Sequence, residues 1–328
     1  MMSFLVFGAL VIWNYSPIEP TTPLTLEKLT IGVEKSILPA TVFIAENKGY
    51  FREEGLDISI KMFNSGKDSF LDMLENRGVD IATVAPTPIM FNSFKRKDFS
   101  IVATFVDSDD DVKLIARNDK GIETAGDLIG KKIGTPSGTT GQFFTDIFLL
   151  MRGIEKDEVE VINISPQELP LALKNNLVDA IVIWEPHAYH AQNLLNGKAK
   201  RIPSSDIYHE TFNFMAMNDF TTNHPQLISK FLRAVIKASQ YTRQHKKEAQ
   251  LIVANRLNME INIIEKLWDD YAFEVSINQE LLLTLELEAR WAIEQNLTGG
   301  VTTVPNYLDY IYTDSLQKIN PEAIGIFH

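Results

Sequence analysis

The first part of the chain alternates short apolar runs with longer stretches in which apolar residues recur every three or four positions. This alternation is typical of α/β units, in which helices pack on a largely parallel sheet. The pattern predicts a strand at residues 29–33 and a helix at 41–51, with Gly49 suited to a helix C-terminal stop. Strands at 56–63 and 79–85 follow, with an amphipathic helix between them.

The same order of elements recurs about a hundred residues later. An Ile-Gly pair opens a strand at residues 133–134, as another does at 31–32, 102 residues earlier. A Val-Asp pair precedes a strand at 178–179, as another does at 79–80, 99 residues earlier. A shared order at a near-constant offset indicates an internal repeat. We therefore predict two similar α/β lobes with mixed, mainly parallel sheets.

Two extended segments are expected to connect the lobes as a two-strand hinge that can open and close. The first follows a strand at 100–106 and contains the acidic run Asp107–Asp111. We interpret this run as a solvated hinge loop, because it lacks the glycine and closing glutamate of a calcium loop. The second is the apolar run at 212–219, which leads to a helix that begins at Pro225.

The C-terminal part of the chain is predicted to be helical and to complete the first lobe. Leu227, Phe231 and Val235 lie at helical spacing on one face of its first helix. The predicted helices are at 226–245, 260–271, 279–295 and 307–319. The predicted division is 28–112 with 218–328 for lobe 1, and 113–217 for lobe 2.

An apolar run of ten residues, FLVFGALVIW, lies at positions 4–13 and is followed by a spacer rich in proline and threonine. The run is too short to span a bilayer comfortably but has the length of a secretory hydrophobic region, although no Lys or Arg precedes it. We interpret residues 1–27 as an export signal or membrane tether with a spacer. The expected location is therefore periplasmic or extracellular.

Composition excludes several classes of function. Acidic residues outnumber basic ones 43 to 31, which gives a formal net charge of −12 and argues against a nucleic-acid groove. The chain has no cysteine, so disulfides, thiolate zinc sites, iron–sulfur clusters and cysteine nucleophiles are excluded. The sequence contains no GxSxG, HExxH or GxGxxG motif. We expect no enzymatic activity, no cofactor and no nucleic-acid partner.

In open α/β sheets, ligands bind beyond the carboxyl ends of the parallel strands. If the two lobes face each other across those ends, they enclose a cleft, where small-molecule sites commonly form. The strongest candidate at these ends is the loop 137–141, Ser-Gly-Thr-Thr-Gly, which precedes a helix. Its hydroxyls and helix N–H groups suit an anion, although an ordinary helix N-cap explains the same residues. The loop lacks the lysine of a phosphate-binding P-loop, which argues against nucleotide hydrolysis.

Trp184 and Glu185 end the last strand of the second repeat. Trp184 offers a flat face to a ligand, or else packs in the core. Glu185 could accept hydrogen bonds from an amine or amidine, or could fix the strand-to-helix turn internally. His187 and His190 are spaced as a helical pair, which we interpret as a surface pair rather than a metal site.

Four segments resemble the signature of periplasmic solute-binding proteins of the SsuA/TauA/NrtA and NMT1/THI5-like type. They are ATVFIAENKGYFREEGLDISI, VDIATVAPTPIM, IETAGDLIGKKIGTPSGTTGQFF and VDAIVIWEPHA. The resemblance covers residues 29–220 and implies the type II periplasmic binding-protein fold. It also implies a monomeric receptor that delivers a small-molecule solute to an ABC transporter permease with its cytoplasmic ATPase.

Carried over position by position, the resemblance implies a set of ligand-binding residues and no metal site. They are Ser36, Ile37, Leu38, Asn64, Ser65, Gly66, Ala85, Pro86, Thr87, Ser137, Gly138, Thr139, Thr140, Trp184 and Glu185. The implied solute is a small polar organic molecule that is sulfonate-like, taurine-like or similar to a pyrimidine precursor of thiamine.

Two alternatives remain open at this stage. One is the ligand-sensing domain of a signalling system, whose binding chemistry would be the same. The other is a THI5-like pyrimidine synthase, a relative that uses lysine-bound pyridoxal phosphate and a cysteine-rich iron motif. The absence of cysteine counts against the synthase.

Overall fold

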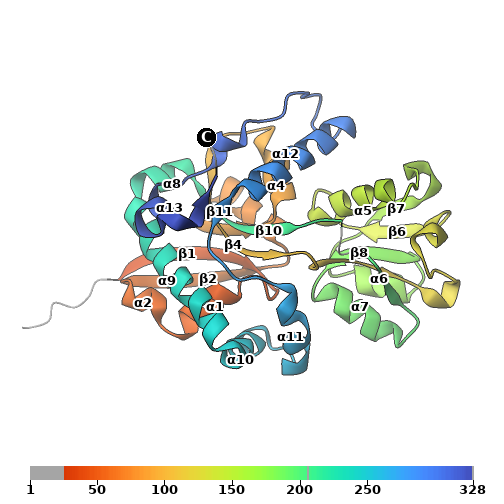
Figure 1. Ribbon diagram of the computed structural model, residues 1–328, viewed down its shortest axis with the longest axis horizontal. Helices are drawn as coiled ribbons and strands as arrows, with labels where there is room; N and C mark the ends of the chain where they lie inside the picture. Colours follow the sequence, from red (N-terminus) through yellow and green to blue (C-terminus); the bar gives the residue numbers. More distant parts are fainter. Residues whose placement is uncertain (1–25, 205–206, 327–328) are drawn as a thin grey trace, which may run out of the picture.

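The computed structural model describes residues 26–204 and 207–326, which form two α/β lobes lying side by side (Figure 1). Each lobe is built around a five-stranded sheet. The apolar run at 4–13 and nearly all of the predicted signal or tether lie outside the described residues. Among the described helices, none combines the length and the apolar character needed to cross a membrane.

The strands follow the predicted alternation. In chain order they are β1 (Glu27–Glu34), β2 (Leu56–Phe63), β3 (Ile81–Val84), β4 (Phe99–Ser108), β5 (Val112–Ala116), β6 (Lys132–Thr135), β7 (Glu160–Asn163), β8 (Ala180–Trp184), β9 (Lys200–Ile202), β10 (Glu210–Met217), β11 (Ile277–Asn278) and β12 (Ile324–Gly325).

The α-helices between and after the strands are labelled in the same order. They are α1 (Ala40–Asn47), α2 (Tyr50–Glu53), α3 (Gly66–Leu71), α4 (Pro86–Ser93), α5 (Thr140–Met151), α6 (Leu169–Lys174), α7 (His187–Leu195), α8 (Asn218–Asn223), α9 (Pro225–Gln244), α10 (Lys246–Leu257), α11 (Ile261–Leu267), α12 (Gln279–Glu294) and α13 (Asp314–Ile319).

The two sheets have the same plan, as the repeat predicted. Their strand orders are β2-β1-β3-β10-β4 and β7-β6-β8-β5-β9. In each, the first strand of the repeat lies between two parallel neighbours, and a crossing strand runs antiparallel to both of its neighbours. In each sheet four of the five strands therefore run in the same direction, so the sheets are mixed and mainly parallel, as predicted. The crossing strands β10 and β5 run antiparallel because each enters its sheet from the other lobe.

The connections between lobes run from β4 to β5 and from β9 to β10 (Figure 1). β10 does more than connect, because it pairs with β3 and β4 in the middle of the first sheet. All eight of its residues are buried. Residues 210–217, placed in lobe 2 by the sequence-based division, thus belong to the first lobe's sheet. A strand covered on both faces lacks the alternation of apolar and polar residues that marks a half-exposed strand, so the sequence did not show that this segment joins the first sheet.

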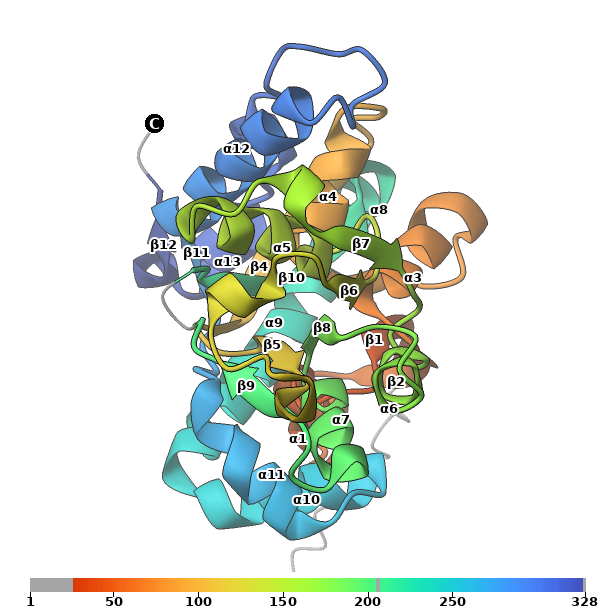
Figure 2. The same ribbon diagram turned by 90° about the vertical axis from the view of Figure 1, so that its right-hand side faces the viewer.

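The C-terminal helices pack on the first lobe, so both ends of the described chain build its core. That core joins Leu29 and Ile31 of β1 to Phe231 of α9 and Leu285 of α12, whereas the second lobe has a separate core. Seen from the second lobe in Figure 2, α12 and α4 lie at one end of the molecule and α10 and α11 at the other.

Some helix boundaries differ from the sequence-based expectation. The predicted stop at Gly49 is confirmed, because this residue has φ +75° between α1 and α2. The helix predicted to run to 245 is followed at once by α10, with His245 in a non-helical conformation (φ −132°) between them. The last predicted helix is interrupted, with a 3₁₀ turn at Tyr307–Tyr310 and α13 after it.

Candidate functional site

A small cavity of about 20 Å³ lies between the lobes, at the carboxyl ends of β1, β3 and β8. The first lobe contributes loops after β1 to β3, the second lobe contributes the start of α5 and the end of β8, and β10 forms the floor. The lining residues are Glu34, Ser65, Gly66, Lys67, Ala85, Pro88, Thr139, Thr140, Trp184, Glu210 and Phe212.

The structure brings some of the fifteen sequence-predicted residues together at this cavity and places the others outside it. Those that line the cavity are Ser65, Gly66, Ala85, Thr139, Thr140 and Trp184. Gly138 instead lines a groove on the outer surface. Those outside both linings are Ser36, Ile37, Leu38, Asn64, Pro86, Thr87, Ser137 and Glu185.

The loop after β1 is organised around Glu34, which sequence reasoning missed. One carboxylate oxygen of Glu34 accepts a hydrogen bond from the Ser36 hydroxyl at 2.7 Å, and the other accepts one from the Gly66 N–H at 2.8 Å. Ile37 and Leu38 are in the core of the first lobe. Glu34 therefore ties the β1 loop to the start of α3, and burial raises its pKa despite these two bonds.

The Ser-Gly-Thr-Thr loop uses its own polar groups internally. The Thr139 hydroxyl accepts a hydrogen bond from the Gly141 N–H and donates one to the Pro136 carbonyl. The Ser137 N–H donates to the Asn163 side chain at 2.9 Å, and the Gly138 N–H to the Gln142 side chain at 2.7 Å. These bonds favour the N-cap interpretation over an anion cradle. Thr140, which lines the cavity, forms a side-chain hydrogen bond with Glu210.

Glu185 binds an amine, but the amine belongs to the protein. Its Oε1 lies 2.9 Å from the Lys113 Nζ, and its Oε2 accepts a hydrogen bond from the Tyr189 N–H. Lys113 also lies 2.8 Å from Asp270. Burial lowers the pKa of Lys113, but its carboxylate partners outweigh this effect, so the net pKa is raised. Glu185 thus fixes the turn after β8 internally.

Two buried carboxyl groups flank this region. Glu210, at the start of β10, and Asp111 are 3% and 1% exposed, so Asp111 is not part of a solvated hinge loop. Asp111 accepts a hydrogen bond from the Tyr271 hydroxyl at 2.5 Å. Its second oxygen, and the Oε2 of Glu210, accept no hydrogen bond from any described residue. Burial raises both pKa values well above their ordinary range, and repulsion from neighbouring carboxyl groups adds to this, from Asp111 for Glu210 and from Glu34 for Asp111.

A third buried carboxyl, Glu288 of α12, lies behind the start of α4. Its Oε1 accepts hydrogen bonds from the Thr87 hydroxyl at 2.8 Å and the Tyr208 hydroxyl at 3.0 Å. Burial raises its pKa from 4.5 to about 8. A signal for it exists in the sequence, because Glu288 lies three and seven residues after the buried Leu285 and Leu281, on the apolar face of the helix.

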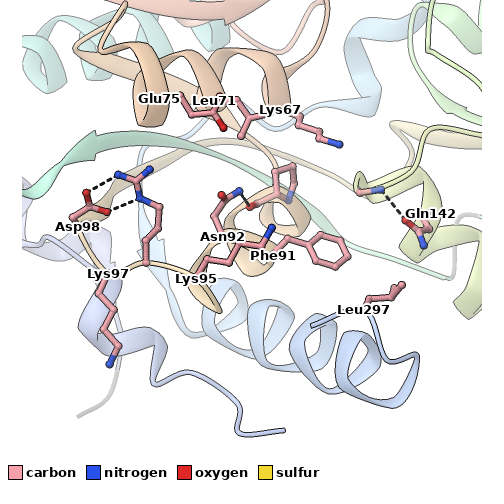
Figure 3. A pocket seen from close by; sticks show the side chains of 13 residues that line it. Lys67, Leu71, Glu75, Phe91, Asn92, Lys95, Lys97, Asp98, Gln142 and Leu297 are labelled. Atoms are coloured by element: carbon pink, nitrogen blue, oxygen red, sulfur yellow. Dashed lines mark hydrogen bonds and ion pairs between the residues drawn. The ribbon is translucent and has the colours of Figure 1, made fainter. Parts of the chain in front are cut away.

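The outer groove lies beside the cavity, and Lys67 lines both (Figure 3). In Figure 3 the Lys67 side chain points from α3 toward the loop that precedes Gln142. Its Nζ donates a hydrogen bond to the Ser137 carbonyl at 3.0 Å, which joins the two lobes. Arg96, which also lines the groove, forms a two-bond ion pair with Asp98.

Within residues 26–204 and 207–326, no group of three or more His, Asp or Glu side chains is arranged to hold a metal ion. His187 and His190 lie on α7, near each other but without such a group. Burial, with the neighbouring His190, lowers the pKa of His187 to about 4. His187 is therefore neutral at pH 7.

Comparison with known proteins finds a family model and a curated relative that each match most of the chain. The family model described as NMT1/THI5 like matches residues 39–249. The chain is 26% identical over 250 residues to a putative aliphatic sulfonates-binding protein of Bacillus subtilis, which covers 73% of each chain.

Solved structures match the fold over most of the chain. The periplasmic aliphatic sulphonate-binding protein SsuA of Escherichia coli aligns with a TM-score of 0.74 at 19% identity, covering 88% of this chain and 98% of that one. The desulfurization enzyme DszB aligns with a TM-score of 0.65 at 14% identity, covering 90% and 99%. The fold thus occurs in both binding proteins and an enzyme.

Proposed function

The chain belongs to the NMT1/THI5-like family, and from this we propose that it is an extracytoplasmic solute-binding protein that serves an ABC importer. It captures a small polar organic molecule between its lobes by hinge closure and delivers the molecule to the permease. The observation that carries the proposal is the cavity at the facing carboxyl ends of two similar sheets, joined by two crossing segments.

Hinge closure is supported by hydrogen bonds that join the lobes outside the cavity. Lys67 of the first lobe donates to the Ser137 carbonyl, and Gln167 of the second lobe donates to the Asn64 carbonyl at 3.1 Å. The Trp291 indole N–H donates to Asp146 at 2.9 Å. Opening the lobes would break these bonds. A ligand shifts the balance toward closure only by binding the closed form more tightly.

The walls of the cavity suit a polar organic solute. At about 20 Å³ the cavity is far smaller than typical small-molecule pockets, so the lobes must part to admit a solute. Trp184 and Phe212 supply apolar walls, and Thr139, Thr140 and Ser65 supply hydroxyl groups. A sulfonate, taurine or a pyrimidine precursor of thiamine are the solutes that the family resemblance suggests. A micromolar affinity corresponds to about 8 kcal/mol of binding free energy.

We propose a receptor rather than an enzyme, and a location outside the cytoplasm. The relative from Bacillus subtilis carries a binding-protein name. The chain lacks the cysteines on which the synthase alternative depends. A sensor domain would use the same cleft, and a cell-fractionation experiment combined with pull-down of the permease separates transport from sensing.

Ligand titration monitored by tryptophan fluorescence and small-angle scattering tests the proposal. We expect at least one solute among alkanesulfonates, taurine, nitrate and hydroxymethylpyrimidine to change the emission and to reduce the radius of gyration. Trp184→Phe should remove most of the emission change, because Trp184 lines the cavity. Trp268→Phe, in the core of the first lobe, is the matched control and should retain it. If no solute changes either signal, and native mass spectrometry finds no co-purified molecule, the receptor proposal fails.

A further inference from the structure

We propose that the solute carries a positive charge, as an ammonium or amidinium group, and that Glu210, which lines the cavity, accepts a hydrogen bond from it while the nearby buried Asp111 adds negative charge. The inference rests on the proposed receptor function and narrows the class of ligand. It runs against the first expectation from the sequence, which was an anion held by the Ser-Gly-Thr-Thr loop.

The charge around the cavity is the first observation. Glu34, Glu210 and Asp111 are each at most 5% exposed. They also interact electrostatically with one another, since Glu34 and Asp111 both act on Glu210, and Glu34 acts on Asp111. Three carboxyl groups are thus gathered in one buried region, in which an unpaired charge is strongly disfavoured.

The nearby cations are already engaged. Lys113 is close enough to act on Asp111, but its Nζ contacts Glu185 and Asp270. Lys67 lines the cavity and lies at the boundary with the outer groove, where it donates to the Ser137 carbonyl. The described residues therefore supply fewer positive than negative groups around this cavity.

Hydrogen bonding gives the second, independent observation. The Oε2 of Glu210 and the Oδ2 of Asp111 accept nothing from the described residues, although both atoms are buried. An ionised carboxylate only accepts hydrogen bonds, so a ligand that satisfies it must bring N–H or O–H donors, whereas the protonated form carries an O–H donor of its own. Ammonium and amidinium groups bring two or three donors together with the charge that favours the ionised form. A sulfonate or nitrate brings acceptors and negative charge, which the ionised form repels.

The pKa values imply that binding of a cation is coupled to the release of protons. Burial raises the pKa of Glu210 and Asp111 well above normal. Both groups are surrounded mostly by acidic partners: Glu210 is acted on by Asp111, Glu34 and Glu288, with a hydrogen bond from Thr140. Asp111 is acted on by Glu34, Glu185 and Lys113, with a hydrogen bond from Tyr271. A bound cation favours the ionised carboxylates, so its binding should release protons to the buffer.

The remaining walls indicate an organic cation rather than a metal ion. The described residues contain no arrangement of three or more ligating side chains for a metal. Trp184 and Phe212 face the same cavity as Glu210. An aromatic face is attractive to an organic cation and also packs against an apolar body. The expected ligand is therefore a compact amine or amidine with a flat or apolar portion.

Pairs of probes with matched shape and opposite charge test the inference by calorimetry. Benzamidine is compared with benzoate, and phenethylamine with phenylpropionate, in two buffers of different ionisation enthalpy. We expect at least one cation to bind tenfold or more tightly than its anionic partner, with proton release. Native mass spectrometry of the gently purified protein should show a co-purified cation.

Two isosteric variants separate recognition from structure. Glu210→Gln and Asp111→Asn should each weaken cation binding tenfold or more, while the ligand-free protein melts at the same or a higher temperature. Removing charge repulsion is stabilising, whereas removing a purely structural carboxylate is destabilising. Glu260→Gln, at the exposed start of α11, is the control and should change neither property.

Each outcome decides one of the two proposals. If the anion of either pair binds more tightly than its cation, or the co-purified molecule is an anion, the inference is overturned and the receptor function stands. If both isosteric variants lower the melting temperature and leave the cation-to-anion ratio unchanged, the carboxyl groups are structural and the inference is again overturned. If no probe binds and nothing co-purifies, both proposals fail.

Discussion

Glu288 links the stability of the protein to pH. Its side chain is fully buried on α12, and burial raises its pKa from 4.5 to about 8, although hydrogen bonds from Thr87 and Tyr208 favour the ionised form. Between these two values the folded protein keeps the proton that the unfolded chain has lost. The folded state therefore binds more protons, and the free energy of unfolding falls as the pH rises through this interval.

The size of the effect follows from the two pKa values. Integrating the difference in proton binding from pH 5 to pH 8 gives a loss of about 3.5 kcal/mol from this group alone. Glu288→Gln keeps the shape of the side chain and an oxygen that can accept from Thr87 and Tyr208, but it cannot ionise. We expect E288Q to match the wild type within about 1 kcal/mol at pH 5, and to be more stable by roughly 2–4 kcal/mol at pH 8.

Urea unfolding followed by tryptophan fluorescence at pH 5, 6, 7 and 8 measures the effect. Glu294→Gln, exposed on the same helix, is the control and should leave the wild-type slope unchanged. Glu210 and Asp111 have pKa values raised in the same direction, so part of the slope remains in E288Q. Equal destabilisation of E288Q at all four pH values would refute the assignment, because the carboxyl would then act only through its hydrogen bonds.

Three further predictions concern closure and packing. Trp291→Phe removes the hydrogen bond to Asp146 between the lobes, and we expect a solute affinity two- to tenfold lower, with a larger radius of gyration without ligand. Gly66→Ala would place a Cβ 3.1 Å from backbone atoms of β3, so we expect a loss of about 1–3 kcal/mol in urea unfolding. Gly126→Ala, which has space, should be nearly neutral. Lys113→Met leaves buried carboxylates without their cation, and a loss of about 3–5 kcal/mol should lower the melting temperature; an unchanged value would contradict the ion-pair geometry.

The sequence predicted the fold well where the local pattern determines the structure. Matching dipeptides at a near-constant offset predicted the repeat. Gly49 predicted a helix end, because the left-handed backbone conformation that ends a helix is adopted most easily by glycine. The position of β10 was not predictable in this way. A fully buried strand carries no alternation that identifies its sheet, so its partners are set by the tertiary structure.

The candidate site was harder to predict, because its chemistry depends on pairs of distant residues. Glu185 was a reasonable candidate for binding the amine of a ligand. In the structure it binds the amine of Lys113, 72 residues earlier in the chain. From the sequence, the N–H groups of Ser137 and Gly138 were candidates for binding an anion. In the structure they donate hydrogen bonds to the side chains of Asn163 and Gln142 instead. Asp111 lies in an acidic run, which is normally solvated, and only the contact with Tyr271 and the lobes around it bury the side chain.

The distribution of contacts suggests why closure can respond to a solute. Hydrogen bonds between described residues of opposite lobes lie outside the cavity, among them those from Lys67 to Ser137, Gln167 to Asn64 and Trp291 to Asp146, and each favours closure by about 1 kcal/mol. At the cavity, the Oε2 of Glu210 is buried without a partner among the described residues, which costs about 1–3 kcal/mol. A solute that supplies a donor to Glu210 removes this cost, so the same contact that recognises the solute also shifts the lobes toward the closed state.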